Sequence, residues 1–389
     1  MVGPKKVYLE FLRGAAAIIV VLYHYNEIYA NRFSKPFLFS NWGTDAVIIF
    51  FILSGCVINM SQTRNPKPRK KFMWNRILRL YPQFLVGLLL GLLIIIVLKL
   101  PFPSIDKLLG NIFMLDTLQG YIVKCLTTNS PMWSLSFEMF FYCMFAIAIG
   151  SNQKRIIQIL FLLSLVSLPF YYIYTDKNVV VHFIAMMSYL SIWLVGYYIY
   201  EYRNLFYVDI YTAVLSASLL PLVSRIHMSN QYHDPAKYLL FALIATPLFR
   251  YCLQLPPQGK KIKLAYLLPV YLLIVVLMFF RSDSMLNSKI VYSIIPIIAV
   301  GVFYILNHVR LKQQLIALVN FSGAVTGKYS YSLYIIHYPV QFFFVNIARS
   351  HFMFVALSLP VIILASFLLE SELQPQIIKL FTPVEPIPG

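Results

Sequence analysis

The stretch FLRGAAAIIVVLYHY, residues 11–25, places two ionisable side chains in a segment otherwise apolar enough to cross a membrane. Arg13 and His24 are eleven residues apart, so at 100° per residue they return to within about 20° of one helix face, about 16 Å apart along the axis. Glu10 and Glu27 fall on the same face. Because an arginine at the centre of a membrane helix costs about 2.5–3.5 kcal/mol on insertion scales, this face is a candidate functional surface. An arginine snorkelling from a helix end beside a structural histidine explains the pattern equally well.

The composition around this segment is that of a membrane protein. The chain is 60% hydrophobic and only 12% charged, with a mean hydropathy of +0.73, whereas soluble domains average about 25% charged residues. Apolar runs of about twenty residues recur along the whole length, which predicts an all-α fold, a polytopic transmembrane helix bundle of about 10–12 spans with no soluble domain. The expected spans are residues 10–29, 44–61, 80–100, 132–150, 156–174, 180–200, 206–224, 237–253, 264–280, 289–306, 330–349 and 352–370.

Charge sets the expected orientation. Most of the 32 Lys and Arg residues lie in alternate loops, above all in RNPKPRKKFMWNRILR, residues 64–79, which places these loops, and both termini, in the cytoplasm. The net charge of +18 is therefore interpreted as a topology signal, not as a sign of nucleic-acid binding. The four cysteines form no CxxC pair, and no metal site is expected. Residues 1–375 are predicted to form the transmembrane domain and residues 376–389 a short Pro-rich cytoplasmic tail.

Five stretches with candidate functional residues occur in a fixed order: FLRGAAAIIVVLYHY, IIFFILSGCVI (48–58), RILRLYP (76–82), PMWSLSFEMFFY (131–142) and YSYSLYIIHYPV (329–340). In this order and spacing they resemble the acyltransferase-3 family of integral membrane O-acyltransferases, over most of residues 8–375. The most specific marks are Arg-x10-His, Phe-Phe-x-x-Ser-Gly, Arg-x-x-Arg and Trp-Ser-Leu-x-x-Glu. The resemblance implies transfer of acyl groups, commonly acetyl from acetyl-CoA, onto sugars of cell-envelope polysaccharides such as lipopolysaccharide or exopolysaccharide.

Acyl transfer to a sugar hydroxyl needs a base, and the pKa of histidine suits that task at neutral pH. We assign the base to His24, in the outer half of the membrane. Glu138 is expected about 9 Å below the outer end of its helix, close to the same level, where it could share a cavity with His24. A neighbouring acid, for which we choose Glu27 over Asp45 and Asp116, would fix the histidine tautomer. A structural hydrogen bond is the alternative role for Glu138.

The phosphates of coenzyme A call for fork-shaped guanidinium groups at the inner face. Arg76 and Arg79, one helical turn apart, meet this need, and Arg13 lies at a similar depth. Simple positive-inside anchoring is the alternative for Arg76 and Arg79. His337 either lines the donor channel or bonds a backbone carbonyl. The pair Ser54–Gly55 is expected to pack helices closely, and Trp133 to anchor the protein at the membrane interface.

The predicted protein is thus an acyl-CoA-dependent O-acetyltransferase of the bacterial cytoplasmic (inner) membrane. It carries an acyl group from cytoplasmic acetyl-CoA to a carbohydrate or lipid-linked glycan at the outer side, within membrane lipids and without a metal. Direct transfer is favoured over an acyl-histidine intermediate, which stays open. A transporter or flippase of a lipid-linked glycan is the rival from another class, since it would use the same buried charges without coenzyme A.

Overall fold

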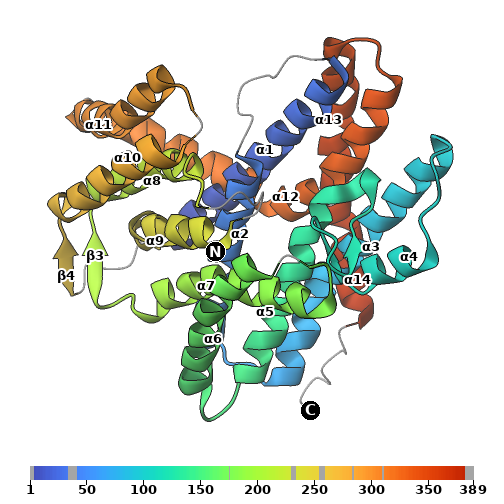
Figure 1. The fold of residues 1–389 in the computed structure, drawn as a ribbon, viewed down its shortest axis with the longest axis horizontal. Coiled ribbons are helices and arrows are strands. Elements are labelled where there is room, and N and C mark those ends of the chain that lie inside the picture. Colours follow the sequence, from blue (N-terminus) through green and yellow to red (C-terminus); the bar gives the residue numbers. More distant parts are fainter. Residues whose placement is uncertain are drawn as a thin grey trace, which may run out of the picture.

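The computed structural model describes residues 4–33, 42–174, 176–228, 234–253, 259–282, 284–308 and 311–381, which are mostly helical (Figure 1). The helices are α1 (Pro4–Phe33), α2 (Gly43–Arg64), α3 (Arg69–Val97), α4 (Ile105–Ile112), α5 (Trp133–Ala148), α6 (Gln153–Ile173), α7 (Val179–Glu201), α8 (Ile210–Ser224), α9 (Pro235–Cys252), α10 (Leu268–Arg281), α11 (Leu286–His308), α12 (Leu311–Ile347), α13 (His351–Leu368) and α14 (Gln374–Phe381). Short 3-10 turns, η1 (Thr127–Met132) and η2 (Leu264–Leu267), precede α5 and α10, and a π-helical turn, η3 (Leu369–Leu373), follows α13. The strands β1 (Asp116–Thr117) and β2 (Val123–Lys124) pair in parallel, as do β3 (Phe206–Val208) and β4 (Lys260–Ile262).

The predicted all-α membrane bundle is confirmed. Within the described residues, nine helical segments are long and apolar enough to cross a membrane. Of the three remaining expected spans, 237–253 and 330–349 coincide with α9 and the second half of α12, whereas 206–224 begins on strand β3 and continues as α8. Every expected span therefore contains a helix.

The helix boundaries differ from those expected in three places. Helix α3 begins at Arg69 and α12 at Leu311, both well before the apolar runs that predicted them. Hydropathy detects only the most apolar part of a helix, so about three turns at the start of α3 and about five at the start of α12 were missed. The start of the expected C-terminal tail belongs to α14, and the Pro-rich end PVEPIPG lies outside the described residues.

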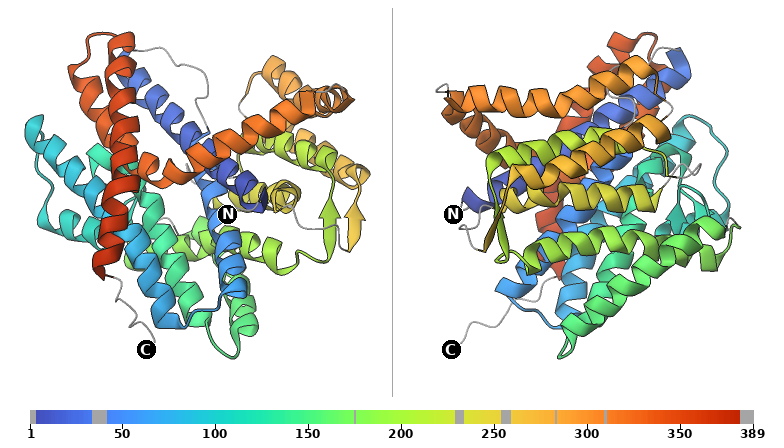
Figure 2. Two further views of the ribbon diagram at one scale, coloured as in Figure 1. Left: turned by 180° about the vertical axis from the view of Figure 1, so that it is seen from behind. Right: turned by 60° about the vertical axis from the view of Figure 1, so that its left-hand side comes forward.

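Helices α1 and α2 occupy the middle of the bundle. Figures 1 and 2 show α8–α11 gathered on one flank and α3, α4, α13 and α14 on the opposite flank. α1 packs along α12, and α2 along α7. The middle is thus enclosed by helices from distant parts of the chain.

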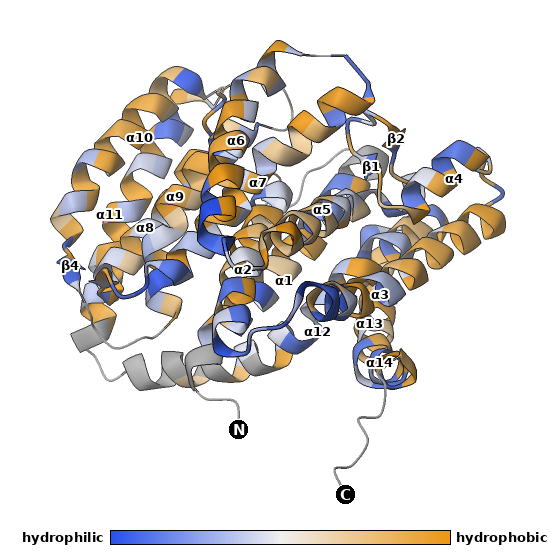
Figure 3. Cartoon of the chain, turned by 90° about the horizontal axis from the view of Figure 1, so that it is seen from below, coloured by the Kyte–Doolittle hydropathy of each residue, from blue (hydrophilic) through white to orange (hydrophobic). Residues whose placement is uncertain are grey.

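The outward surface of the bundle is apolar. Figure 3 shows hydrophobic residues along the outer sides of α3 and α10. Leu93 of α3 is 54% exposed, and Leu272 and Phe280 of α10 are 60% and 83% exposed. Side chains of this kind, so exposed on long apolar helices, suit contact with lipid.

Glycines set the closest helix contacts. A Cβ atom at Gly55 of α2 would lie 2.0 Å from the backbone oxygen of Trp193, and one at Gly196 of α7 would lie 2.1 Å from the oxygen of Ile52. The two backbones therefore touch, which confirms that Ser54–Gly55 packs helices. A Cβ atom at Gly327 of α12 would lie 2.6 Å from the backbone oxygen of Glu10 in α1.

We predict that Gly55→Ala lowers the thermal stability of the purified protein in detergent. The added methyl group meets immovable backbone, and overpacking of this kind costs about 1–3 kcal/mol. The matched control is Gly301→Ala in α11, where an added Cβ meets no atom within 4 Å, so this change should be neutral or slightly stabilising. An unchanged unfolding temperature for Gly55→Ala would contradict the close contact of α2 with α7.

Candidate active site

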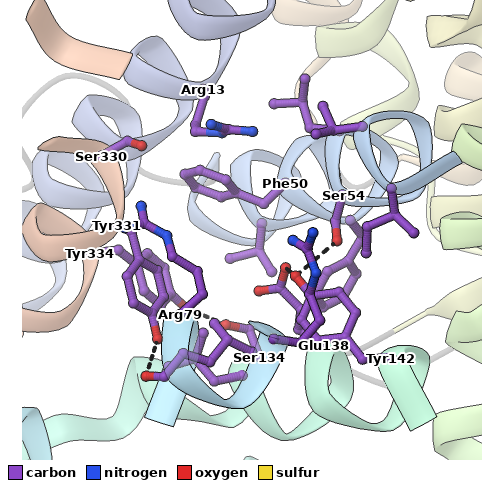
Figure 4. A pocket seen from close by; sticks show the side chains of 18 residues that line it. Arg13, Phe50, Ser54, Arg79, Ser134, Glu138, Tyr142, Ser330, Tyr331 and Tyr334 are labelled. Atoms are coloured by element: carbon purple, nitrogen blue, oxygen red, sulfur yellow. Dashed lines mark hydrogen bonds between the residues drawn. The ribbon is translucent and has the colours of Figure 1, made fainter. Parts of the chain in front are cut away.

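A cavity of about 270 Å³ lies among α1, α2, α3, α5 and α12 (Figure 4). We call it the arginine cavity, because Arg13, Arg76 and Arg79 line it together with Glu138. Its remaining lining is Val47, Phe50, Phe51, Leu53, Ser54, Val57, Ile58, Leu80, Ser134, Leu135, Tyr142, Ser330, Tyr331 and Tyr334. The structure thus brings together the three arginines that we assigned to the donor.

Arg79 is held by an ion pair. Its Nη1 donates to Oε1 of Glu370 at 2.6 Å, and the other oxygen of Glu370 accepts bonds from Gln83 Nε2 at 3.0 Å and Ser332 Oγ at 2.6 Å. Glu370 belongs to the π-helical turn η3, a distortion that often marks functional sites. This network fixes the guanidinium of Arg79 at the rim of the cavity.

Within the described part of the chain, Arg76 and Arg13 have no ion pair of the kind that holds Arg79. Nε of Arg76 is buried without a hydrogen-bond partner, and its guanidinium instead lies 5.5 and 5.8 Å from the ring centroids of Phe72 and Tyr142. Among the described residues, no side chain hydrogen-bonds or pairs with Arg13, although the charges of Glu138 and Arg79 both act on it. Buried donors without a partner are costly, so both arginines have capacity for an anionic ligand.

Glu138 ends a chain of hydrogen bonds. Indole Nε1 of Trp193 donates to Ser54 Oγ at 3.1 Å, Ser54 donates to the Tyr142 hydroxyl at 3.3 Å, and Tyr142 donates to Glu138. The hydrogen bond of the alternative, structural role is therefore present, because Tyr142 and Glu138 both belong to α5. Its carboxylate nevertheless lines the arginine cavity, near enough to attract Arg13.

A second cavity, also of about 270 Å³, contains His24. We call it the histidine cavity. It is lined by Tyr23, His24, Glu27, Gly43, Thr44, Val47, Leu118, Ser130, Pro131, Trp133 and Tyr334. Aromatic rings, hydroxyls and one carboxylate surround the imidazole.

His24 forms a dyad with Glu27. Nδ1 of the imidazole lies 2.7 Å from Oε2 of Glu27, and Nε2 has no partner among the described residues. A carboxylate that accepts from Nδ1–H leaves Nε2 as the basic nitrogen, which is the arrangement of a general base. The structure thus places Glu27, of the three acids that we considered, beside His24.

The other two acids are bound elsewhere. Asp45 accepts a bond of 2.6 Å from Ser224, and Asp116, which is fully buried, accepts one of 2.7 Å from Ser136. Burial raises the pKa of the Asp116 carboxyl. Asp45 thus joins α2 to α8 and Asp116 joins β1 to α5, and neither bond involves His24.

His337 lies beside His24, not among the arginines. The two ring centroids are 5.3 Å apart. Nδ1 of His337 lies 3.1 Å from the carbonyl oxygen of Leu333, so of the two roles that we left open, the bond to a backbone carbonyl is present. Its Nε2 is buried without a partner.

His24 and Glu138 do not share one cavity. They line two adjoining cavities, because Val47 of α2 and Tyr334 of α12 lie at the boundary and line both. The sequence suggested a single cavity because the two residues lie at a similar depth in the membrane. Equal depth does not fix which way each helix is turned, so it does not place the two side chains on facing surfaces.

Sequence reasoning also missed aromatic residues that line the two cavities, and it missed Glu370, which pairs with Arg79. Trp133, expected at the membrane interface, is only 6% exposed and lines the histidine cavity. Tyr142 and Tyr334 lie inside the motifs that drew attention to Glu138 and His337, and their position there was an available signal. Glu370 carried the signal of an acid at the end of an apolar run, although Glu372 shares that position in the sequence.

The fold and the cavities define an integral membrane protein with a cationic cavity next to a His–Glu dyad. A family model described as an acyltransferase domain matches residues 6–371. The chain therefore belongs to the acyltransferase-3 family and is a membrane acyltransferase. No curated protein and no solved structure matches it.

We predict that His24→Ala abolishes acyl transfer while the protein still inserts into the membrane. Loss of a general base typically costs about 10²–10⁴-fold in rate. Transfer is measured as acylation of envelope glycans, at equal protein level in the membrane fraction. His351→Ala, at the start of α13, is the control and should transfer normally. Normal acylation by His24→Ala at equal abundance would refute the assignment.

Proposed function

We propose that the protein is an O-acetyltransferase that moves an acetyl group from acetyl-CoA to a hydroxyl of a cell-envelope carbohydrate. The observation that carries the proposal is the adjacency of the arginine and histidine cavities, which meet at Val47 and Tyr334. One cavity offers cations for an anionic donor and the other offers a base for a hydroxyl.

The arginine cavity fits the phosphate-rich donor. Nε of Arg76 is buried without a hydrogen-bond partner, and no side chain of the described residues hydrogen-bonds Arg13. Guanidinium forks match phosphate oxygens. Arg79 adds a third cation whose position is fixed by Glu370. In this proposal the arginines hold the pyrophosphate or 3′-phosphate, and the thioester arm points toward the histidine cavity.

The histidine cavity fits a sugar hydroxyl. Nε2 of His24 takes the proton from the hydroxyl as its oxygen attacks the thioester carbonyl carbon. Glu27 holds the imidazole in the required tautomer and stabilises the imidazolium. The carbon–sulfur bond then breaks, and the imidazolium returns the proton to the departing thiolate of coenzyme A. The ester and the free thiol are the products, and His24 is restored without an acyl-enzyme intermediate.

The two cavities also suggest a direction for the reaction. Arg76 and Arg79 stand at the end of the basic segment 64–79, which we expect on the cytoplasmic side. His24 lies about 16 Å from Arg13 along α1. An acyl-pantetheine arm is of comparable length. In the bacterial inner membrane, donor nucleotide would thus stay at the cytoplasmic side while the acceptor enters from outside.

We predict that Arg76→Ala and Arg79→Ala each weaken acetyl-CoA binding about ten- to a hundredfold, corresponding to about 1.5–3 kcal/mol for a hydrogen bond to a charged group. Lysine at either position should restore binding only in part, because a point charge lacks the planar fork. Binding is titrated by calorimetry with purified protein in detergent.

Lys70→Ala is the matched control, since Lys70 is an exposed cation on the same helix outside the cavity. Wild-type affinity in the Arg76→Ala/Arg79→Ala double variant would reduce both arginines to topological anchors. Absence of stoichiometric acetyl-CoA binding to the wild-type protein would refute acetyl-CoA as the acyl donor.

We predict that the protein alone carries the acetyl group across a membrane. It is reconstituted into sealed liposomes with labelled acetyl-CoA on one side and acceptor glycan on the other, and orientation is fixed by protease mapping of the 64–79 segment. Label should reach the acceptor only when acetyl-CoA faces the side of Arg76. Transfer that requires donor and acceptor in one compartment would disprove the crossing while leaving the enzyme class intact.

A further inference from the structure

The boundary between the two cavities is formed by few side chains. Of the described residues, only Val47 and Tyr334 line both cavities. Tyr334 is 5% exposed, and its ring lies edge-on to Phe50 at 5.9 Å and tilted against His337 at 5.8 Å. The phenol ring therefore stands between the arginine cavity and the immediate surroundings of His24.

The hydroxyl of Tyr334 is held by the segment where η1 meets α5. It donates to the backbone oxygen of Pro131 at 2.6 Å. It also lies 2.6 Å from Ser134 Oγ, which can donate in return (Figure 4). Pro131 and Ser134 flank the junction of η1 and α5. Two neutral hydrogen bonds are each modest in net strength, so the phenol can be released without disrupting a buried charge.

The motif Trp-Ser-Leu-x-x-Glu spans this boundary. Trp133 lines the histidine cavity, Ser134 holds Tyr334, and Glu138 lines the arginine cavity. One and a half turns of α5 thus pass from one cavity to the other, with the serine at the crossing point. This position explains why a serine stands between two residues with such different surroundings.

We propose that Tyr334 and Val47 form a gate between the donor and acceptor cavities, latched by Ser134, and that the acyl group must pass this gate to reach His24. The proposal rests on the proposed function, because it takes the donor to be in the arginine cavity and the base in the histidine cavity. The closed gate separates the thioester from water and hydroxyls in the histidine cavity. The space beside Val47 when the gate opens limits the size of the acyl group.

If Tyr334 is no longer held in place, acetyl-CoA should be hydrolysed without an acceptor, which we call the leak. Water in the histidine cavity would lose a proton to His24 as its oxygen attacks the thioester carbonyl. The carbon–sulfur bond would break, and coenzyme A would leave as the protonated thiol beside free acetate. The leak is thus hydrolysis of acetyl-CoA without an acceptor, catalysed by the same base.

The first test uses Tyr334→Phe, which keeps the ring and loses both hydrogen bonds, and Ser134→Ala, which weakens the latch with the tyrosine intact. The ratio of acetyl-CoA hydrolysis to glycan acetylation should rise at least several-fold in both variants. This ratio does not depend on the amount of folded protein. Tyr198→Phe on α7, which lines neither cavity, is the matched control and should keep the wild-type ratio. A wild-type ratio in both latch variants overturns the gate.

The second test changes the width of the gate. Val47→Ala should raise the ratio of butyryl to acetyl transfer at least several-fold, and an unchanged ratio overturns the role of Val47 in acyl selection. Acetyl-CoA binding to the wild-type protein is measured in parallel. If the wild-type protein does not bind acetyl-CoA, the proposed function itself is refuted. If it binds acetyl-CoA but the hydrolysis and acyl-transfer ratios of the variants equal those of the wild type, only the gate is refuted.

Discussion

Arg13, Arg76 and Arg79 bring three guanidinium groups into one region of an apolar helix bundle, where an ionised group is costly without partners. Much of the surrounding structure answers this requirement. Glu370 pairs with Arg79 from a π-helical turn, and Phe72 and Tyr142 present their rings to Arg76. Arg13 is attracted by Glu138 but hydrogen-bonded by no described side chain. The compensation is incomplete, and an anionic substrate group would complete it.

The division of the interior into two cavities separates two kinds of chemistry. Charges act over longer distances in a low-dielectric interior than in water, so a base placed directly among three cations would hold a proton less readily. His24 instead lies behind Val47 and Tyr334, with Glu27 on its Nδ1. In the function that we propose, the same separation would keep the acceptor apart from the thioester.

Close backbone contacts make these positions reproducible. Gly327 lets α12 approach α1, and this contact brings Tyr334 and His337 beside His24. Gly55 and Gly196 lock α2 to α7, which positions Ser54 to receive the bond from Trp193. Without a hydrophobic driving force between helices in lipid, such close packing is a main source of specificity. The cavities are therefore defined by small residues that line neither of them.

Local and periodic information in the sequence determined the helical class, the location of every expected span and the common face of Arg13 and His24, because hydropathy and helical periodicity depend only on near neighbours along the chain. It also offered Glu27, three residues after His24, as one of three candidate acids for the partner of the imidazole, and this pairing is present. Only the tertiary structure decided that His24 and Glu138 occupy separate cavities, that His337 belongs with His24, and that Glu370 holds Arg79. Helix rotation and neighbour choice depend on contacts between segments hundreds of residues apart, for which no local pattern exists. The glycines that permit these contacts are visible in the sequence, but their partners are not.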